Sequence, residues 1–224
     1  MKQYYGAIFD LDGTLLDSMG VWRQLDIDFL GKRGLEVPAD YLEAITPLGF
    51  ERAAAYTIHR FSLPETPEEI IAEWMEMARK AYANKVVLKP NVRGYLERLS
   101  ELGIPIAAAT SSDRELFLPA LRRNGISDYF QSIVTVSEVT RGKGFPDIYE
   151  KAAEQIGEAP QNCVVYEDII EGIRGANLGG FYSVGVYDRE SEFNRPAILR
   201  ESRHYIQNFR ELLQLHQDHF CFPE

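Results

Sequence analysis

The sequence predicts an α/β fold in which a parallel sheet forms the core and an all-helical segment is inserted after the first strand. Two observations favour this fold. Over residues 85–224, short apolar runs alternate with segments of helical spacing, and a glycine follows almost every such segment. Residues 18–84 show helical spacing and no convincing strand. We therefore expect a core domain of residues 1–17 and 85–224 and a helical domain of residues 18–84.

The first strand is predicted by an apolar run at residues 4–9, which ends at Asp10. After Leu11, the residues Asp12-Gly13-Thr14 are typical of a turn, because glycine adopts backbone conformations that other residues avoid. Strand and turn together place acidic side chains directly after a buried strand.

Large apolar residues recur with helical spacing through the inserted segment. Thr66 and Pro67, followed by two glutamates, are typical of a helix start, since threonine caps and proline suits the first turn. Asn84 is interpreted as a linker residue. The helices expected here span about residues 19–33, 39–46, 50–61 and 67–83.

The rest of the chain predicts the remainder of the sheet. Continuous apolar strands between helices indicate parallel strands covered on both faces. A loop is predicted at the polar residues 188–203, and a terminal helix at 209–215. The strands are expected at residues 104–109, 133–136, 163–166 and 182–186, and the intervening helices at 91–102, 114–124, 146–156 and 169–178.

Composition excludes several classes of function. A net charge of −10 without any Lys/Arg run disfavours nucleic-acid binding. The two cysteines lack the spacing of a zinc site or a disulfide framework. No apolar stretch reaches the roughly 18 residues of a membrane span, and the first residues lack the apolar core of a signal peptide. We expect a cytoplasmic protein, monomeric or homodimeric, with no nucleic-acid or membrane partner.

Reactive side chains follow the predicted strands. In open parallel sheets, ligands bind at the carboxyl ends of the strands, and carboxylates gathered there call for a hard cation such as Mg²⁺. A cation, a lysine and hydroxyl donors together can hold a phosphoryl group, which a carboxylate can attack. The residues expected at this edge are Asp10, Asp12, Thr110, Ser111, Ser112, Lys143, Glu167 and Asp168.

The order and spacing of these residues resemble the haloacid dehalogenase (HAD) superfamily, and its β-phosphoglucomutase and phosphoglycolate phosphatase-like members most of all. The resemblance covers nearly the whole chain, and the helical insertion matches the family's cap domain. Four segments carry it: Phe9-Asp10-Leu11-Asp12-Gly13-Thr14-Leu15-Leu16-Asp17-Ser18, Ala109-Thr110-Ser111-Ser112, Lys143 with Pro146-Asp147, and Tyr166-Glu167-Asp168 with Glu171-Gly172-Ile173.

The resemblance implies a Mg²⁺-dependent phosphatase that acts on a small phosphorylated substrate through an aspartyl-phosphate. Asp10 would be the nucleophile and a metal ligand, and Asp12 the general acid and base, with its backbone carbonyl on the metal. Asp168 would bind Mg²⁺, with Glu167 as a ligand or just behind the ligands. The remaining roles are implied for Lys143, which would bridge nucleophile and phosphate; for Thr110, Ser111 and Ser112, which would hold phosphate; and for Asp17 and Ser18, at the hinge to the cap.

The chain also departs from the family pattern. Gly144 stands where proline is frequent, and Ile169 where serine is frequent. Mutase members have a histidine where this chain has Trp22, which disfavours a sugar-phosphate mutase. Asp12 disfavours a dehalogenase, because a departing halide needs no proton. A non-catalytic binder of phosphorylated ligands is disfavoured because Asp10, Asp12, Lys143 and Asp168 are all present.

Two of the motifs also have a plainer interpretation. Lys143 alone would be a solvated surface lysine, and Arg141 competes with it for the same role. The hydroxyls at residues 110–112 would alone be a helix cap, although a helix N-terminus also binds phosphate. The segment 49–52 is a candidate substrate-facing loop of the cap.

Overall fold

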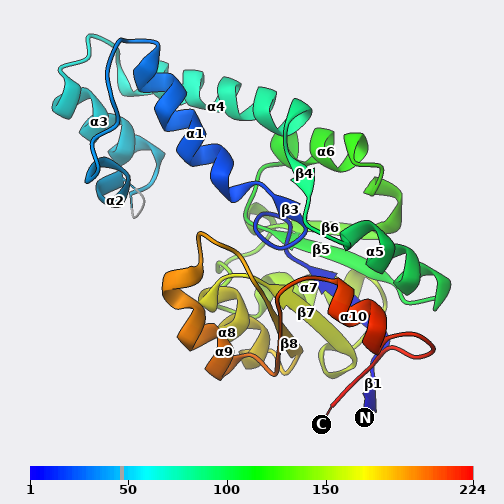
Figure 1. The fold of residues 1–224 in the computed structure, drawn as a ribbon. Coiled ribbons are helices and arrows are strands. Elements are labelled where there is room, and N and C mark those ends of the chain that lie inside the picture. The colour runs from blue at the N-terminus through cyan, green and yellow to red at the C-terminus, as the bar shows by residue number, and fades with distance from the viewer. Residues whose placement is uncertain (46–47, 224) are drawn as a thin grey trace. The chain divides into compact units, whose positions relative to one another are not determined.

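The computed structural model describes residues 1–45 and 48–223, and they divide into two compact units. One unit comprises Met1–Ser18 with Val86–Glu224, and the other comprises Met19–Lys85. Figure 1 shows the first as a sheet flanked by helices and the second as helices alone. No helix in the described part of the chain is both long and apolar enough to span a membrane.

The sheet of the first unit has six strands in the described residues, all parallel, in the order β6-β5-β2-β7-β8-β9. The chain starts in the middle at β2, adds β5 and β6 on one side, and then adds the other three strands on the opposite side. The strand order therefore reverses between β2 and β7, where such sheets bind ligands. The strands are β2 (Gly6–Phe9), β5 (Ile106–Thr110), β6 (Ser132–Thr135), β7 (Cys163–Glu167), β8 (Tyr182–Val186) and β9 (His204–Ile206).

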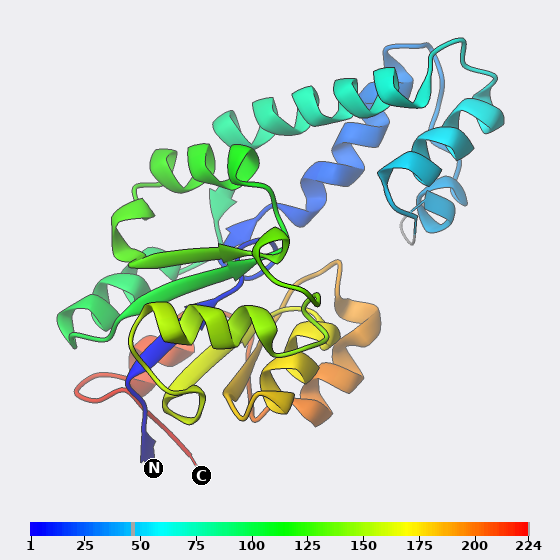
Figure 2. The ribbon, with the colours of Figure 1, turned by 180° about the vertical axis from the view of Figure 1, so that it is seen from behind.

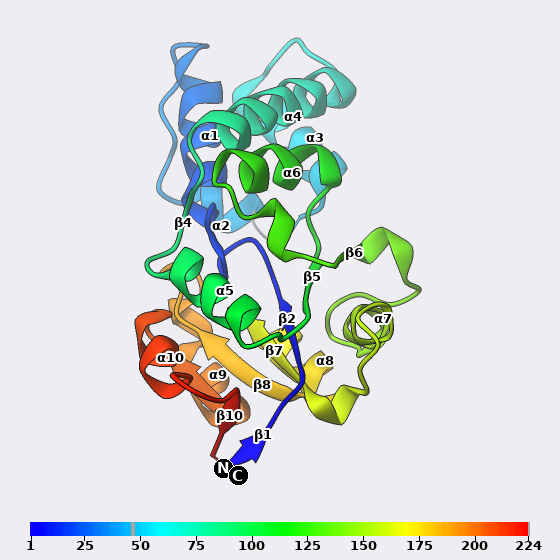
Figure 3. The ribbon, with the colours of Figure 1, turned by 90° about the vertical axis from the view of Figure 1, so that its right-hand side faces the viewer.

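Helices cover both faces of this sheet (Figures 2 and 3). On one face, α7 (Asp147–Gln155) packs on β2, β5 and β6, and α8 (Ile170–Leu178) packs on β7 and β8. On the other face, α5 (Val92–Glu101) and α10 (Arg210–Leu215) pack together. Strands β2, β5, β7 and β8 are buried on both sides and consist mostly of apolar residues, as the sequence predicted. Two further helices belong to this unit, α6 (Arg114–Arg123) and α9 (Arg195–Glu201).

Two short antiparallel pairs complete the first unit. One joins β1 (Lys2–Gln3) to β10 (Cys221–Phe222). The other joins β3 (Leu16–Asp17) to β4 (Val87–Leu88). The strands β3 and β4 are the parts of the chain that lead into the helical unit and return from it. Neither pair was predicted, because strands of two residues carry no periodicity.

The helical unit has the elements that the sequence predicted. Its helices are α1 (Met19–Gly31), α2 (Tyr41–Ile45), α3 (Phe50–Phe61) and α4 (Pro67–Asn84). The predicted start of α4 is confirmed, because Thr66 and Glu69 form a reciprocal capping box. Residue 46, the predicted end of the second helix, lies outside the described residues. Asn84 is not a linker residue: it ends α4, and its amide donates to the carbonyl of Lys80 at 2.8 Å.

The prediction of a loop at residues 188–203 was wrong over its second half, which contains α9. Ile198 is the buried residue of that helix, so its sequence shows no apolar stripe. The glycines predicted to end helices do so: Gly103, Gly125, Gly157 and Gly180 all have positive φ. The terminal helix predicted at 209–215 is α10.

An aromatic cluster lies on the α5–α10 face of the sheet, and His216 is buried within it. His216 Nε2 lies 3.0 Å from the carbonyl oxygen of Cys221 and must donate to it, because a carbonyl only accepts. In the neutral ring, Nδ1 then accepts from the Tyr95 hydroxyl at 2.9 Å. The Tyr95 oxygen in turn accepts from the Tyr166 hydroxyl at 2.6 Å. In this arrangement the buried imidazole is uncharged.

Acid is therefore expected to destabilise the fold through His216. Burial lowers the pKa of His216 to about 4, whereas the unfolded chain titrates near 6.5, so the unfolded state takes up the proton first as the pH falls. Between pH 7 and pH 5 the loss should be about 2 kcal/mol. Urea unfolding at both pH values measures it, and the loss should shrink in His216→Gln but not in His59→Gln, an exposed control. An equal loss in wild type and His216→Gln would contradict this assignment.

Candidate active site

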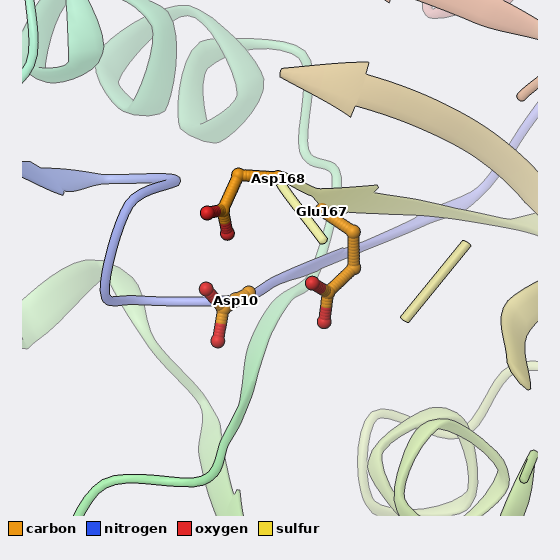
Figure 4. Close-up of side chains that lie close together, drawn as sticks. All are labelled: Asp10, Glu167 and Asp168. Atoms are coloured by element: carbon orange, nitrogen blue, oxygen red, sulfur yellow. The ribbon is translucent and has the colours of Figure 1, made fainter. Parts of the chain in front are cut away.

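The ends of β2 and β7, on either side of the point where the strand order reverses, carry three carboxylates. Asp10 follows β2, Glu167 ends β7 and Asp168 follows it, and all three are buried. One oxygen from each residue lies within 4.8 Å of those of the other two. Figure 4 shows the three side chains turned toward one another from two neighbouring strands. This convergence is what the sequence predicted for these residues.

Lys143 is the cation of this cluster. Its ammonium donates to Asp10 Oδ1 and lies 2.6 Å from Glu167 Oε1. The competing residue, Arg141, is instead paired with Asp147 at 2.7 Å on the surface. Burial alone would lower the pKa of Lys143, but the two carboxylates raise it above its usual value, so the lysine is charged at neutral pH.

The cluster has more carboxylates than Lys143 alone can balance. Burial raises the pKa of Glu167 to about 7. It raises the pKa of Asp168 well above its usual value, and the carboxylates of Asp10 and Glu167 raise it further. Glu167 Oε2 is buried and has no hydrogen-bond partner among the described residues. Three carboxylates around one lysine, together with an unpaired buried oxygen, fit a hard divalent cation.

Hydrogen bonds that the sequence analysis missed fix the carboxylates. Tyr149 donates to Glu167 Oε1 at 2.7 Å. Thr14 donates to Asp168 Oδ1 at 3.1 Å, and Ser191 donates to Asp168 Oδ2 at 3.2 Å. Thr14 belongs to the first motif and could have been suspected. Tyr149 and Ser191 lie far from their partners in sequence, and nothing in their local pattern marks them.

Asp12 lies two residues beyond Asp10 and is only partly buried. Ser18 donates to its Oδ1 at 2.5 Å, which fixes the orientation of the carboxylate. Asp12 does not belong to the cluster of three carboxylates. A carboxylate that is more open to solvent than Asp10 can exchange protons with a substrate or with water.

The predicted phosphate-binding residues lie at the end of β5, the strand beside β2. Thr110 is buried, and its hydroxyl oxygen accepts from the backbone N–H of Ser112 at 3.0 Å. Ser112 is partly buried and Ser111 is exposed. This turn leads into α6, so it offers hydroxyl and amide donors at the same edge of the sheet as Asp10.

Three glycines make room for the site. A Cβ at Gly13, whose φ is +83°, would overlap the Asp168 carboxylate. A Cβ at Gly172 would overlap the Glu167 carboxylate, and one at Gly175 would overlap the backbone oxygen of Lys143. The close packing of α8 therefore requires glycine at two positions, one against Glu167 of β7 and one against the backbone of the segment that carries Lys143.

Replacing Gly172 by alanine is expected to push Glu167 out of place and to weaken cation binding. The overlap should cost about 1–3 kcal/mol, because a methyl group is forced into a filled space. Gly94→Ala, in the interior of α5, is the matched control: its Cβ meets Leu213 Cδ1 at an ordinary 3.6 Å, and alanine should stabilise that helix by about 0.5–1 kcal/mol. Chemical denaturation and Mg²⁺ titration of both variants measure the effects, and equal stability of the two would contradict this account.

The chain is similar to proteins of one family along most of its length. A family model described as haloacid dehalogenase-like hydrolase matches residues 6–180. The chain is 29% identical over 188 residues to fructose-1-phosphate phosphatase YqaB of Escherichia coli (strain K12), covering 83% of this chain and 97% of that protein. It is 29% identical over 183 residues to hexitol phosphatase A of the same organism, covering 81% and 82%.

A solved structure shows the same fold. The putative β-phosphoglucomutase from Thermotoga maritima superposes with a TM-score of 0.83 at 22% identity, covering 96% of this chain and 99% of that one. The predicted α/β fold and the resemblance to the HAD superfamily are thus confirmed. The protein belongs to the haloacid dehalogenase-like hydrolase family.

Proposed function

We propose that this protein is a Mg²⁺-dependent phosphatase that hydrolyses a small phosphomonoester, such as a sugar phosphate, through an aspartyl-phosphate at Asp10. The observation that carries the proposal is the convergence of Asp10, Lys143, Glu167 and Asp168 at the ends of β2 and β7. Relatives named as phosphatases of fructose 1-phosphate and of hexitols support this class of substrate.

Asp10 and Asp168 would hold the cation through their carboxylates, with the backbone carbonyl of Asp12 and with Glu167 as a ligand or just behind the ligands. The cation would neutralise the oxygens of the phosphoryl group and orient it. The fit rests on the surplus of carboxylates and on the unpaired Glu167 Oε2.

In the first step, the free oxygen of Asp10 attacks phosphorus, and the bond between phosphorus and the ester oxygen breaks. Asp12, protonated, gives its proton to the leaving alkoxide, so a neutral alcohol departs. Lys143 contacts the nucleophile and stabilises the charge on the transferred oxygens. Thr110 and the turn that follows it, at the end of the neighbouring strand, would hold the phosphoryl group.

In the second step, the Asp12 carboxylate takes a proton from water, and the water oxygen attacks phosphorus. The bond between Asp10 and phosphorus breaks, which regenerates the Asp10 carboxylate, releases inorganic phosphate and leaves Asp12 protonated for the next cycle. We assign the helical unit, Met19–Lys85, the role of a cap that selects the substrate and excludes water.

The test is phosphate release from a panel of small phosphomonoesters, with Mg²⁺ and with a chelator. Turnover that requires Mg²⁺ supports the proposal, and the best ester identifies the substrate. A hexose 1-phosphate in the panel separates hydrolysis from isomerisation, because a mutase would give an isomeric hexose phosphate and little free phosphate. Absence of release from every ester, by folded protein that binds Mg²⁺, would contradict a broad phosphatase.

A further inference from the structure

Asp168 is held at both carboxylate oxygens by hydroxyl groups. Thr14 donates to Oδ1 at 3.1 Å and Ser191 donates to Oδ2 at 3.2 Å. Thr14 comes from the turn after Asp12, whereas Ser191 comes from the loop that follows β8. The residue directly after Asp168 is Ile169, which has no hydroxyl. The second hydroxyl on this carboxylate therefore comes from a segment more than twenty residues further along the chain.

A buried ion pair fixes the loop that carries Ser191. Asp188 Oδ2 lies 2.7 Å from Lys89 Nζ, and the two side chains are only 5% and 12% exposed. The same ammonium donates to the carbonyl of Tyr187 at 2.6 Å. Asp188 Oδ1 accepts from the backbone N–H of Glu190 at 2.9 Å, which turns the chain toward Ser191. An ion pair that is shielded from water and satisfied by further hydrogen bonds holds its segments in one geometry.

Lys89 connects this loop to the first motif. It follows β4 directly, and its backbone N–H donates to the carbonyl of Leu15 at 2.9 Å. Leu15 lies between Thr14 and β3, the strand that pairs with β4. Lys89 thus contacts both segments that carry a hydroxyl to Asp168. Its backbone binds the segment of Thr14 through Leu15, and its side chain binds the loop of Ser191 through Asp188.

We propose that Ser191 is a positioning residue that fixes Asp168 for the cation, and that the Lys89–Asp188 pair holds Ser191 in place. This inference rests on the cation site of the proposed function. A carboxylate that is already fixed in its binding orientation loses less conformational freedom on cation binding than a carboxylate that rotates freely, and it therefore binds the cation more tightly. Removal of a residue that hydrogen-bonds to a metal ligand typically weakens metal binding by about 10–100-fold.

The experiment is calorimetric titration of the full-length protein with Mg²⁺ in the absence of substrate. Ser191→Ala is expected to raise the Kd for Mg²⁺ by about tenfold or more, and Ser191→Thr, which keeps the hydroxyl, should remain near wild type. Ser183→Ala is the matched control. Ser183 is also buried, and its hydroxyl donates to Asn177 Oδ1 at 2.8 Å, away from the carboxylates. Ser191→Ala with wild-type affinity, or a loss equal to that of Ser183→Ala, would overturn the proposal.

Asp188→Asn tests the role of the ion pair. This variant should also weaken Mg²⁺ binding. Two causes would have this effect: release of the loop that carries Ser191, and loss of a negative charge near the site. Charge loss alone would add to the effect of Ser191→Ala in the double variant. If Asp188 acts by holding Ser191, the double variant should bind Mg²⁺ about as well as Ser191→Ala alone. Full additivity would overturn the role of the ion pair.

Phosphate release distinguishes this proposal from the proposed function. The Mg²⁺ concentration that half-saturates the rate should rise in Ser191→Ala, and the rate at saturating Mg²⁺ should largely recover. If wild type hydrolyses no ester while Ser191→Ala still weakens Mg²⁺ binding, the phosphatase proposal fails and the positioning role stands. If wild type is an active phosphatase and Ser191→Ala leaves Mg²⁺ binding unchanged, the positioning role fails alone.

Discussion

Replacing Asp10 by asparagine is expected to reduce phosphate release by at least about 10⁴-fold, because the amide oxygen is a poor nucleophile. The change is nearly isosteric, so Lys143 keeps Glu167 as its partner at 2.6 Å. It also removes one of three crowded carboxylates, whose burial is unfavourable without a cation. The metal-free variant should therefore be at least as stable as wild type.

Two measurements and a control variant check this prediction together. Initial rates of phosphate release give the loss of activity, and chemical denaturation in chelator gives the stability of the metal-free fold. Asp128→Asn, at an exposed position, is the control for the substitution itself and should keep wild-type rates. Asp10→Asn with substantial turnover would exclude Asp10 as the nucleophile, even if Mg²⁺ remained necessary.

The sequence predicted the core elements well because their signals are local. Apolar runs gave the strands at residues 163–167 and 182–186 almost to the residue. Glycines with positive φ, such as Gly125 and Gly157, ended the helices where expected. The first motif was also local, since Asp10, Asp12 and Thr14 act within a few residues of one another.

The elements and contacts that escaped prediction depend on distant parts of the chain. Helix α9 buries Ile198, and one buried residue produces no periodic apolar pattern from which the helix could be predicted. Lys143 lies in an irregular segment close to Arg141. The order of the motifs favoured Lys143, but the sequence did not show which of the two side chains reaches Asp10. The structure separates them, because Lys143 is buried against Asp10 while Arg141 pairs with Asp147. Tyr149 and Ser191 reach their carboxylates only through the packing of the sheet.

Replacing Lys143 by methionine is expected to affect both stability and catalysis. Lys143 is 7% exposed and contacts both Asp10 and Glu167. Methionine fills a similar volume but leaves the three carboxylates without their cation. Removing one partner of a buried ion pair typically costs about 3–5 kcal/mol, and that loss should appear in the metal-free protein. Phosphate release should fall by about 10²–10³-fold or more, because a fixed positive charge on the transferred oxygens is lost.

Mg²⁺ should restore part of the lost stability in Lys143→Met, since it supplies positive charge to the same carboxylates, but it should not restore the rate. Adding Asp10→Asn to this variant should recover stability in chelator, because one of the uncompensated carboxylates is removed. Lys80→Met is the surface control: Lys80 is 71% exposed and pairs with Glu76, so its loss should change stability by less than about 1 kcal/mol. If Lys143→Met were as stable as Lys80→Met in chelator, the ion pairs of Lys143 with Asp10 and Glu167 would not stabilise the metal-free protein. The balance of charge proposed for the site would then be wrong.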